Sequence, residues 1–155
     1  MRKELITTAT PDTAPRDSTW LDLDSMATVQ VTSEQEGFPI EGALLEGGKG
    51  WCAASEGTQT IRLIFDKPQK LSRIWMVFDE TENVRTQEFV LRWSSDSGQF
   101  REIVRQQWNF SPPHSTRETE DYAVELSGIT IIELIIVPDK SGGEAKASLA
   151  KLRLA

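Results

Sequence analysis

Hydrophobic and polar residues alternate along most of the chain after its first 25 residues. The clearest example is QTIRLIFDKP, in which Ile61, Leu63 and Phe65 share one face. An alternation of period two indicates a half-buried β-strand, because successive side chains of a strand point to opposite faces. Pro68 cannot donate a hydrogen bond to a neighbouring strand, so we expect this strand to end there.

Other segments show a similar pattern and are separated by turn-forming residues. They are MATVQVTSE, KLSRIWMVFDE, TQEFVLRWSSDSGQF, FREIVRQQW, YAVEL, ITIIELIIVPD and ASLAKLRLA. The stretch 129–137 is apolar on both faces, which indicates a central strand of a packed sandwich. No amphipathic helix of useful length is present, although EGALLEGG permits one helical turn. About eight strands with intervening turns predict an all-β fold, an antiparallel β-sandwich or jelly roll.

The chain has 155 residues, a length that suits one domain with a single core. Its first 25 residues are rich in Thr, Pro, Asp and Ser. We therefore expect an N-terminal arm over 1–25, extended or loosely packed, and a β-sandwich domain over 26–155. The N-terminus lacks the apolar core of a secretory signal, and the single cysteine, Cys52, excludes an internal disulfide. These features favour a cytoplasmic location, with Cys52 as an unreactive thiol.

The charge balance limits the classes of partner. The formal net charge is −7 and the isoelectric point is about 4.8. An acidic surface repels the phosphate backbone of nucleic acids and the headgroups of anionic membranes. No apolar run approaches the roughly 18 residues that a membrane-spanning helix needs. We expect neither a nucleic-acid partner nor a membrane.

From Ala27 onward, the order of the segments resembles the discoidin family, also called coagulation factor V/VIII type C domains, within the galactose-binding-like jelly rolls. The segments that carry the resemblance are FPIEGALLEGGKGW, QTIRLIFDKPQKLSRIWM, FVLRWSSDSGQFREI and IELIIVPDKSGGEAKASLAKLRL. The resemblance implies a sandwich whose end loops bind ligands. It also implies that Trp51 plugs the core where the glycine-rich loop crosses one end.

Many discoidin domains hold a structural calcium ion with an Asp-containing loop and a glutamate near the last strand. Here the loop reads LEGGKGW, and Lys151 stands where the resemblance places that glutamate. An ammonium group repels calcium, which requires anionic or carbonyl oxygens. We therefore expect no metal and no other cofactor, with Glu46 as the carboxylate left for a weak remnant.

A second resemblance leaves an alternative open. KGWCAASEGTQTIRLIFDK, followed by FSPPHSTRE, is similar to the N-terminal domain of the X-ray repair cross-complementing scaffold proteins. That domain has the same jelly-roll fold, and the resemblance implies a protein–protein adaptor that contacts a repair polymerase and nicked DNA. A protein partner is therefore the alternative to a small ligand.

Side chains suited to catalysis are scarce. The sequence contains no G-x-S-x-G, H-E-x-x-H or phosphate-binding glycine loop, and its only histidine is His114. The carboxylate pairs Asp79/Glu80 and Glu118/Glu120 permit glycoside hydrolysis in principle. In a protein of this charge we expect such pairs to form a solvated face. We predict a non-catalytic protein and keep an uncharacterised hydrolase as a less favoured alternative.

Sugar binding fits the residues of two loops. A sugar ring stacks its C–H face on an aromatic side chain, while amide, carboxylate, guanidinium and imidazole groups bind its hydroxyls. The stretch 105–118 and the loop SEQEGFP together contain this set of residues. The predicted ligand-binding residues are Trp108, Asn109, Phe110, His114, Arg117, Glu34, Glu36 and Phe38. For Trp108 a position in the core is the equal alternative, and for Phe110 the equal alternative is an anchor of its proline-rich loop.

Overall fold

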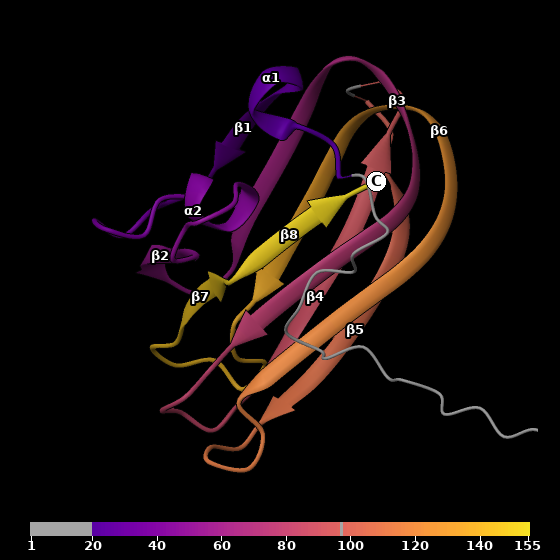
Figure 1. Cartoon of the computed structure of the whole chain (residues 1–155). Coiled ribbons are helices and arrows are strands. Elements are labelled where there is room, and N and C mark those ends of the chain that lie inside the picture. The colour runs from indigo at the N-terminus through magenta and orange to yellow at the C-terminus, as the bar shows by residue number, and fades with distance from the viewer. Residues whose placement is uncertain (1–19, 97) are drawn as a thin grey trace, which may run out of the picture.

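A computed structural model describes residues 20–96 and 98–155, which form an antiparallel β-sandwich (Figure 1). The described part contains eight strands and two one-turn helices. They are α1 (Leu23–Met26), β1 (Ala27–Val31), α2 (Glu41–Leu44), β2 (Trp51–Glu56), β3 (Gln59–Asp79), β4 (Arg85–Ser94), β5 (Arg101–Phe110), β6 (Arg117–Val137), β7 (Lys146–Leu149) and β8 (Lys151–Leu154). The predicted all-β sandwich is confirmed.

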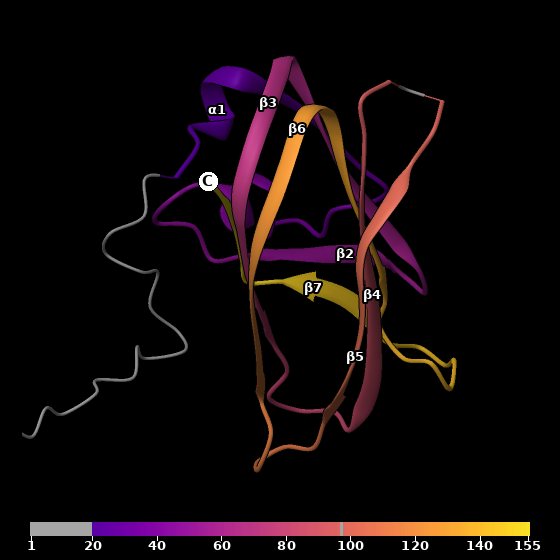
Figure 2. The same ribbon diagram turned by 90° about the vertical axis from the view of Figure 1, so that its right-hand side faces the viewer.

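Strands β3 and β6 are each 21 residues long, pair antiparallel with each other and run through both layers. In one layer, the first part of β3 and the last part of β6 lie between β1 and β4, and β5 forms the outer edge. In the other layer, the rest of β3 pairs with β8 and with the first part of β6. Figure 2 shows β3 and β6 arching over one end of the molecule. Strands β2 and β7 form a separate pair.

The expectation that a strand ends at Pro68 was wrong, because the long strands bend where ends were expected. Strand β3 does not end at Pro68 but continues to Asp79. Its pairing with β6 shifts register between Ile64 and Gln69, so Pro68 lies at the bend, outside the regular ladder. In the same way, YAVEL and ITIIELIIV are parts of one strand, β6, which includes Gly128 at a φ of 71°. A proline that interrupts pairing is compatible with a bend as well as with an end.

The inward faces of the two layers meet in one hydrophobic core. Phe78 from one layer and Phe89 from the other are completely buried and stack with 5.3 Å between ring centroids. Trp51 is 1% exposed, and its Nε1 donates a hydrogen bond to the Ser33 carbonyl at 2.9 Å. The structure thus supports the expected plug, because the indole is buried with its only polar group satisfied.

The glycine-rich loop before Trp51 is built on close backbone contacts. A Cβ atom on Gly48 would lie 2.4 Å from the backbone of Gly42, and one on Gly42 would lie 2.7 Å from the carbonyl oxygen of Gly50. The Gly50 N–H donates to the Gly42 carbonyl at 3.0 Å. Glycine is required where backbones approach this closely. The three glycines therefore let the chain cross α2 and bring Trp51 to the core.

On the outer face, a charged row crosses three strands of the larger layer. Glu133 of β6 is completely buried between Arg62 of β3 and Arg92 of β4. Its carboxylate accepts hydrogen bonds from the Nε atoms of Arg62 and Arg92 at 2.7 and 2.6 Å. The Arg92 guanidinium also lies 4.5 Å from the centroid of the Phe100 ring. Both carboxylate oxygens of Glu133 thus have a charged donor, as a buried charge requires.

Residues 20–25 pack against the sandwich, whereas the rest of the expected arm, residues 1–19, lies outside the described residues. The Trp20 ring stacks on Trp75 at 6.2 Å between centroids, and the Leu21 N–H donates to the Leu154 carbonyl at 2.7 Å. Leu23 is buried. Among the described residues, no helix has the length and apolar character needed to cross a membrane.

Candidate functional site

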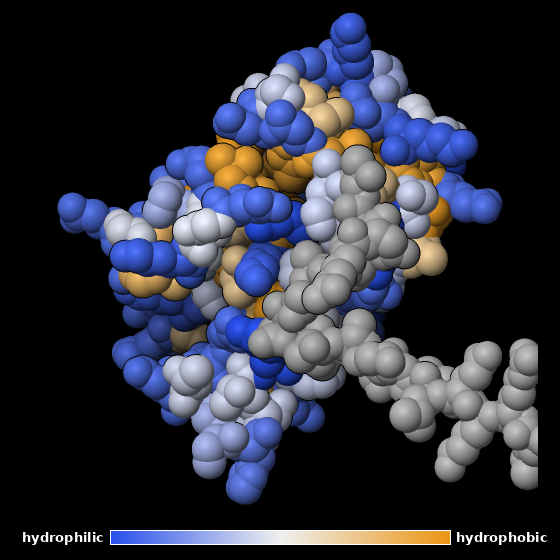
Figure 3. All heavy atoms as spheres, viewed as in Figure 1, coloured by the Kyte–Doolittle hydropathy of each residue, from blue (hydrophilic) through white to orange (hydrophobic). Residues whose placement is uncertain are grey.

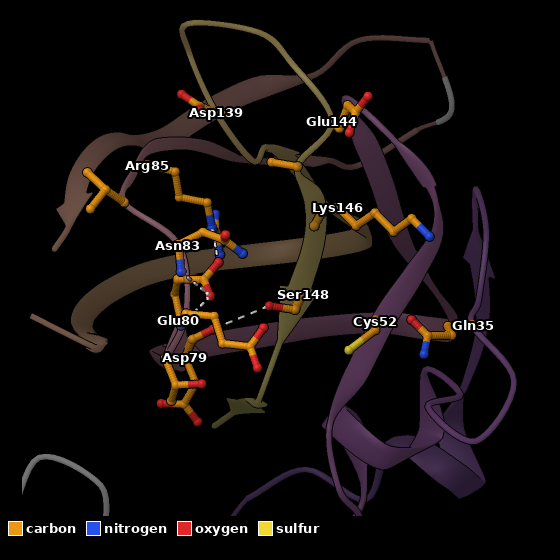
Figure 4. Close-up of a pocket in the computed structure, with 15 residues that line it drawn as sticks. Gln35, Cys52, Asp79, Glu80, Asn83, Arg85, Asp139, Glu144, Lys146 and Ser148 are labelled. Carbon is orange, nitrogen blue, oxygen red and sulfur yellow. Dashed lines mark hydrogen bonds and ion pairs between the residues drawn. The ribbon is translucent and has the colours of Figure 1, made fainter. Parts of the chain in front are cut away.

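A cavity of about 710 Å³ opens between loops that connect the strands (Figure 4). One wall is the segment 79–85, which joins β3 to β4. The opposite wall is the segment 144–148, which leads into β7, with Gln35 and Cys52 beside it. Asp139, at the start of the β6–β7 loop, also lines the cavity. This cavity is the candidate functional site.

Glu80 organises the first wall. Its carboxylate accepts hydrogen bonds from the backbone N–H groups of Glu82 at 3.1 Å and Asn83 at 3.3 Å. It also accepts one from Nε of Arg85 at 2.6 Å. Burial alone would raise the pKa of the Glu80 carboxyl, but these hydrogen bonds outweigh it and lower the pKa. The carboxylate is therefore ionised and holds the loop in a closed turn.

Arg85 connects this wall to its neighbours. Its side chain is only 2% exposed, and its guanidinium donates to the Pro138 carbonyl at 2.7 Å and to Oε1 of Gln87 at 3.1 Å. The guanidinium also lies 4.7 Å from the centroid of the Phe110 ring. Arg85 thus joins the 79–85 segment to the start of the β6–β7 loop. The guanidinium is therefore bonded to groups of the protein itself.

The second wall is positioned by the pairing of β2 with β7, which places Ser148 opposite Cys52. The Ser148 hydroxyl donates to the backbone carbonyl of Asp79 at 3.5 Å. Burial raises the pKa of the Cys52 thiol, so this thiol remains neutral. Two hydrogen bonds from Ser141 lower the pKa of Asp139 and keep its carboxylate ionised. The bond from the Ser141 hydroxyl has the larger effect, and the bond from its backbone N–H has the smaller one.

The side chains lining the cavity are mainly polar. Five are carboxylates, two are cations, and Gln35 and Asn83 supply amides. Val84 is 76% exposed and adds an apolar contact. No aromatic ring lines the cavity within the described part of the chain. In the view of Figure 3, hydrophilic side chains predominate over the lower part of the molecule, whereas hydrophobic ones gather higher. The cavity can bind hydroxyl groups by hydrogen bonding, but it offers no stacking platform.

To bind a metal ion, side chains of the described residues would have to form a group of ligands. Within residues 20–96 and 98–155, no group of three or more histidine, cysteine, aspartate or glutamate side chains is arranged to hold a metal. Two of the five cavity carboxylates are also engaged with arginines, Asp79 with Arg117 and Glu80 with Arg85.

None of the eight sequence-predicted ligand residues lines the cavity, although all lie in the described part of the chain. Phe110 is completely buried, so the expectation that it contacts a ligand is corrected, because its ring belongs to the core. Trp108 is half-buried, packs against the core and lies opposite Gln87 on β4. Its Nε1 is buried without a hydrogen-bond partner among the described residues. Asn109 is exposed and accepts a hydrogen bond from the Thr86 hydroxyl at 2.8 Å.

The other predicted residues of this stretch do not line the cavity either. His114 is exposed in the turn between β5 and β6. Arg117 is also exposed, and its Nε donates to the Asp79 carboxylate at 2.6 Å. Since Asp79 lines the cavity, Arg117 is bonded to a residue of that wall.

The first predicted loop reaches the cavity through a different residue. Glu34 and Glu36 are exposed and Phe38 is half-buried. The Glu34 carboxylate accepts a hydrogen bond from the Ile40 N–H at 2.9 Å and so stabilises the loop. Gln35, between the two predicted glutamates, is the residue of this loop that lines the cavity.

The pair Glu118/Glu120 is not the expected solvated face. Glu118 is completely buried and accepts a hydrogen bond from Nε2 of Gln87 at 3.1 Å. Desolvation, together with the neighbouring Glu120, raises the pKa of Glu118 to about 9, so its carboxyl is neutral at pH 7. Glu120 accepts a hydrogen bond from the Tyr122 hydroxyl at 2.6 Å. The sequence did contain a signal for the burial of Glu118. Residues 118, 120 and 122 alternate in step with Val124 and Leu126, so all five side chains point to the same, inward face of β6.

Sequence reasoning missed most of the residues that line the cavity. Segments 79–85 and 139–148 contain no aromatic residue, whereas the predicted sugar site depended on aromatic side chains. The available signal was the concentration of polar and turn-forming residues in DETEN and PDKSGGE, each of which follows a strongly apolar strand. Nothing in the local pattern indicated that these two loops meet.

No protein-family model and no curated protein matches the sequence. Solved structures do match. A family 32 carbohydrate-binding module from Clostridium perfringens NanJ, in complex with galactose, is 17% identical, with a TM-score of 0.63 over 88% of this chain and 97% of that one. The corresponding module of AlyQ, in complex with 4,5-unsaturated mannuronic acid, is 15% identical, with a TM-score of 0.62 over 89% and 98%.

A third structure is another Clostridium perfringens module of this family, in complex with GalNAc-β-1,3-galactose. It is 20% identical, with a TM-score of 0.61 over 88% of this chain and 99% of that one. At these identities the likeness concerns the architecture, and it confirms the resemblance inferred from the sequence. The chain has the galactose-binding-like jelly-roll fold of family 32 carbohydrate-binding modules.

Proposed function

We propose that the protein is a non-catalytic carbohydrate-binding module whose ligand occupies the cavity between segments 79–85 and 144–148. The observation that carries the proposal is a cavity of about 710 Å³, lined by hydrogen-bonding side chains on the loops of this fold. The solved structures described above hold saccharides, which favours a sugar ligand over the protein-adaptor alternative.

The lining residues suit hydroxyl groups, each of which donates one hydrogen bond and accepts others. Carboxylates such as Glu82 and Glu144 accept from a hydroxyl, Lys146 donates to one, and the Asn83 amide does both. Val84 offers an apolar contact for the C–H face of the ring in place of an aromatic platform. Binding would therefore depend mainly on hydrogen bonds.

The end of β5, the β5–β6 loop and the start of β6 would serve as an extension of this site. Asn109, His114 and Arg117 are exposed, and Arg117 contacts the cavity wall through Asp79. We place them beside the unit that fills the cavity, where a longer saccharide would reach them. Trp108 would support the loop from within, since it packs against the core.

Asn83→Ala tests the site directly. The Asn83 side chain is exposed, and only its backbone N–H contributes to the loop, so the variant should fold normally. We expect affinity for a bound saccharide to fall about three- to tenfold, the effect of one lost neutral hydrogen bond. Isothermal titration calorimetry with a panel of neutral, amino and acidic oligosaccharides would measure it.

The matched control is Glu125→Gln, an exposed residue of β6 outside the cavity, which should leave affinity unchanged. The proposal is overturned if no saccharide of the panel binds the wild-type protein, or if Asn83→Ala binds as tightly as the control.

A further inference from the structure

We infer that the cavity selects saccharides that carry no acid group, so that neutral and amine-bearing sugars bind and uronic acids are rejected. The inference rests on the proposed function, because it takes the cavity as the sugar site. The charges of the lining residues then determine which sugars the cavity accepts. The solved structures of this fold hold both galactose and an unsaturated mannuronic acid, so the fold alone leaves the choice open.

A carboxylate ligand is bound by a free arginine or lysine, or by unpaired backbone N–H groups, and arginine alone binds it with two parallel hydrogen bonds. The only arginine that lines the cavity in the described chain, Arg85, is 2% exposed and is bonded to Glu80, Gln87 and Pro138. The backbone N–H groups of Glu82 and Asn83, on the same loop, already donate to Glu80. The groups on this wall that would bind an acidic sugar are therefore occupied.

The remaining charges are mostly negative. Among the described residues, Glu82 and Glu144 are exposed and form no ion pair, and Asp139 is stabilised as a carboxylate by Ser141. Lys146 is the one cation of the lining that is exposed. Three carboxylates against one ammonium group give the open part of the cavity a negative potential, which focuses cations in a cleft and repels anions.

The same carboxylates favour a sugar amine. An ammonium group near Glu82 or Glu144 would form charge-assisted hydrogen bonds, which are stronger than those of a neutral hydroxyl. A neutral sugar would bind through its hydroxyls and be indifferent to the net charge. The expected order of affinity is amino sugar, neutral sugar, uronic acid.

Three disaccharides of similar size test this order: diglucosamine, galactobiose and digalacturonic acid, titrated by calorimetry at low and high salt. The double variant Glu82→Gln/Glu144→Gln should gain about two- to fivefold affinity for digalacturonic acid per carboxylate removed, as expected for a screened surface charge pair. Affinity for diglucosamine should fall by a similar factor. Half-molar salt should reduce both differences, because screening shortens the range of the potential.

Glu125→Gln removes one exposed carboxylate outside the cavity and should preserve the wild-type order. The inference is overturned if digalacturonic acid binds the wild type as tightly as galactobiose, or if the double variant changes all three affinities equally. In both of these results the proposed sugar site would stand. Absence of binding by every saccharide of the larger panel would instead overturn the proposed function, and the inference with it.

Discussion

Glu118 shows how the position of a single residue changes its chemistry. It lies in a segment, RETEDY, whose composition is that of a solvated surface, yet its side chain is completely buried between the two layers. Desolvation by burial, and the charge of Glu120, raise its pKa to about 9. A carboxyl with a pKa this high holds its proton in the folded state at neutral pH.

Glu118→Gln should therefore make stability less dependent on pH. Between the unfolded carboxyl pKa, about 4.3, and about 9, the folded protein holds a proton that the unfolded chain releases. The wild-type free energy of unfolding should fall across this range as pH rises, by up to about 1.4 kcal/mol per pH unit from this group. The variant removes the ionisable group and keeps an oxygen to accept from Gln87. Urea unfolding of both proteins at pH 5 to 9 measures the difference.

Below the unfolded carboxyl pKa, Glu118 is protonated in both states, so the difference between the two proteins should no longer change with pH. A constant difference in free energy from pH 5 to 9 would show that the buried carboxyl does not retain its proton.

At the scale of elements, the two long strands determine the architecture. Because β3 and β6 bend and pass from one layer to the other, each contributes to both layers. The bend of β6 includes Gly128, whose φ of 71° lies in the left-handed region that glycine adopts without strain. A Cβ atom at Gly128 would meet no atom within 4 Å, so its conformation alone explains the need for glycine.

Gly128→Ala should lower the free energy of unfolding by about 1–2 kcal/mol, the cost of the left-handed region for a residue with a Cβ. Its exposed neighbour provides the control, since Ser127→Ala removes a hydroxyl at a position without a positive φ. Chemical denaturation of the two variants beside the wild type checks the difference. Equal stabilities would mean that the bend relaxes to accept alanine.

At the scale of the whole molecule, shared strands and one continuous core join the two layers. Phe78 and Phe89 stack across the layers, and both are completely buried. Since β3 and β6 run through both layers, neither layer can lose these strands without disrupting the other. The described domain should unfold as one cooperative unit.

Phe89→Ala should reduce the free energy of unfolding by about 3–5 kcal/mol, the usual cost of deleting a buried aromatic side chain. Both layers should lose structure together. Far-ultraviolet circular dichroism and tryptophan fluorescence should give the same midpoint, because the fluorescence sums tryptophans of both layers, Trp75 in one and Trp93 in the other among them. Val84→Ala, at an exposed site, should leave the midpoint nearly unchanged. Separate transitions for the two probes would contradict a single unit.

The sequence by itself determined the fold class and the structural plug. Alternation of apolar residues is a local property, so the strands and the all-β class could be predicted from it. The resemblance to the discoidin family also implied that Trp51 closes the core, and Trp51 is 1% exposed. The order of the segments was sufficient to indicate the galactose-binding-like jelly roll.

Only the tertiary structure decided how strands continue and where ligands have room. Pro68 interrupts strand pairing whether the strand ends or bends there. Pairing with β6, which is distant in sequence, continues beyond Pro68, so the expected strand end is a bend. Phe110 and Glu118 are completely buried, and Glu118 is bonded to Gln87 of the other layer, a contact between residues distant in sequence. The cavity arises where the β3–β4 and β6–β7 loops meet, joined by Arg85 and Pro138. Such a site depends on long-range packing, so its residues become visible only when the chain is folded.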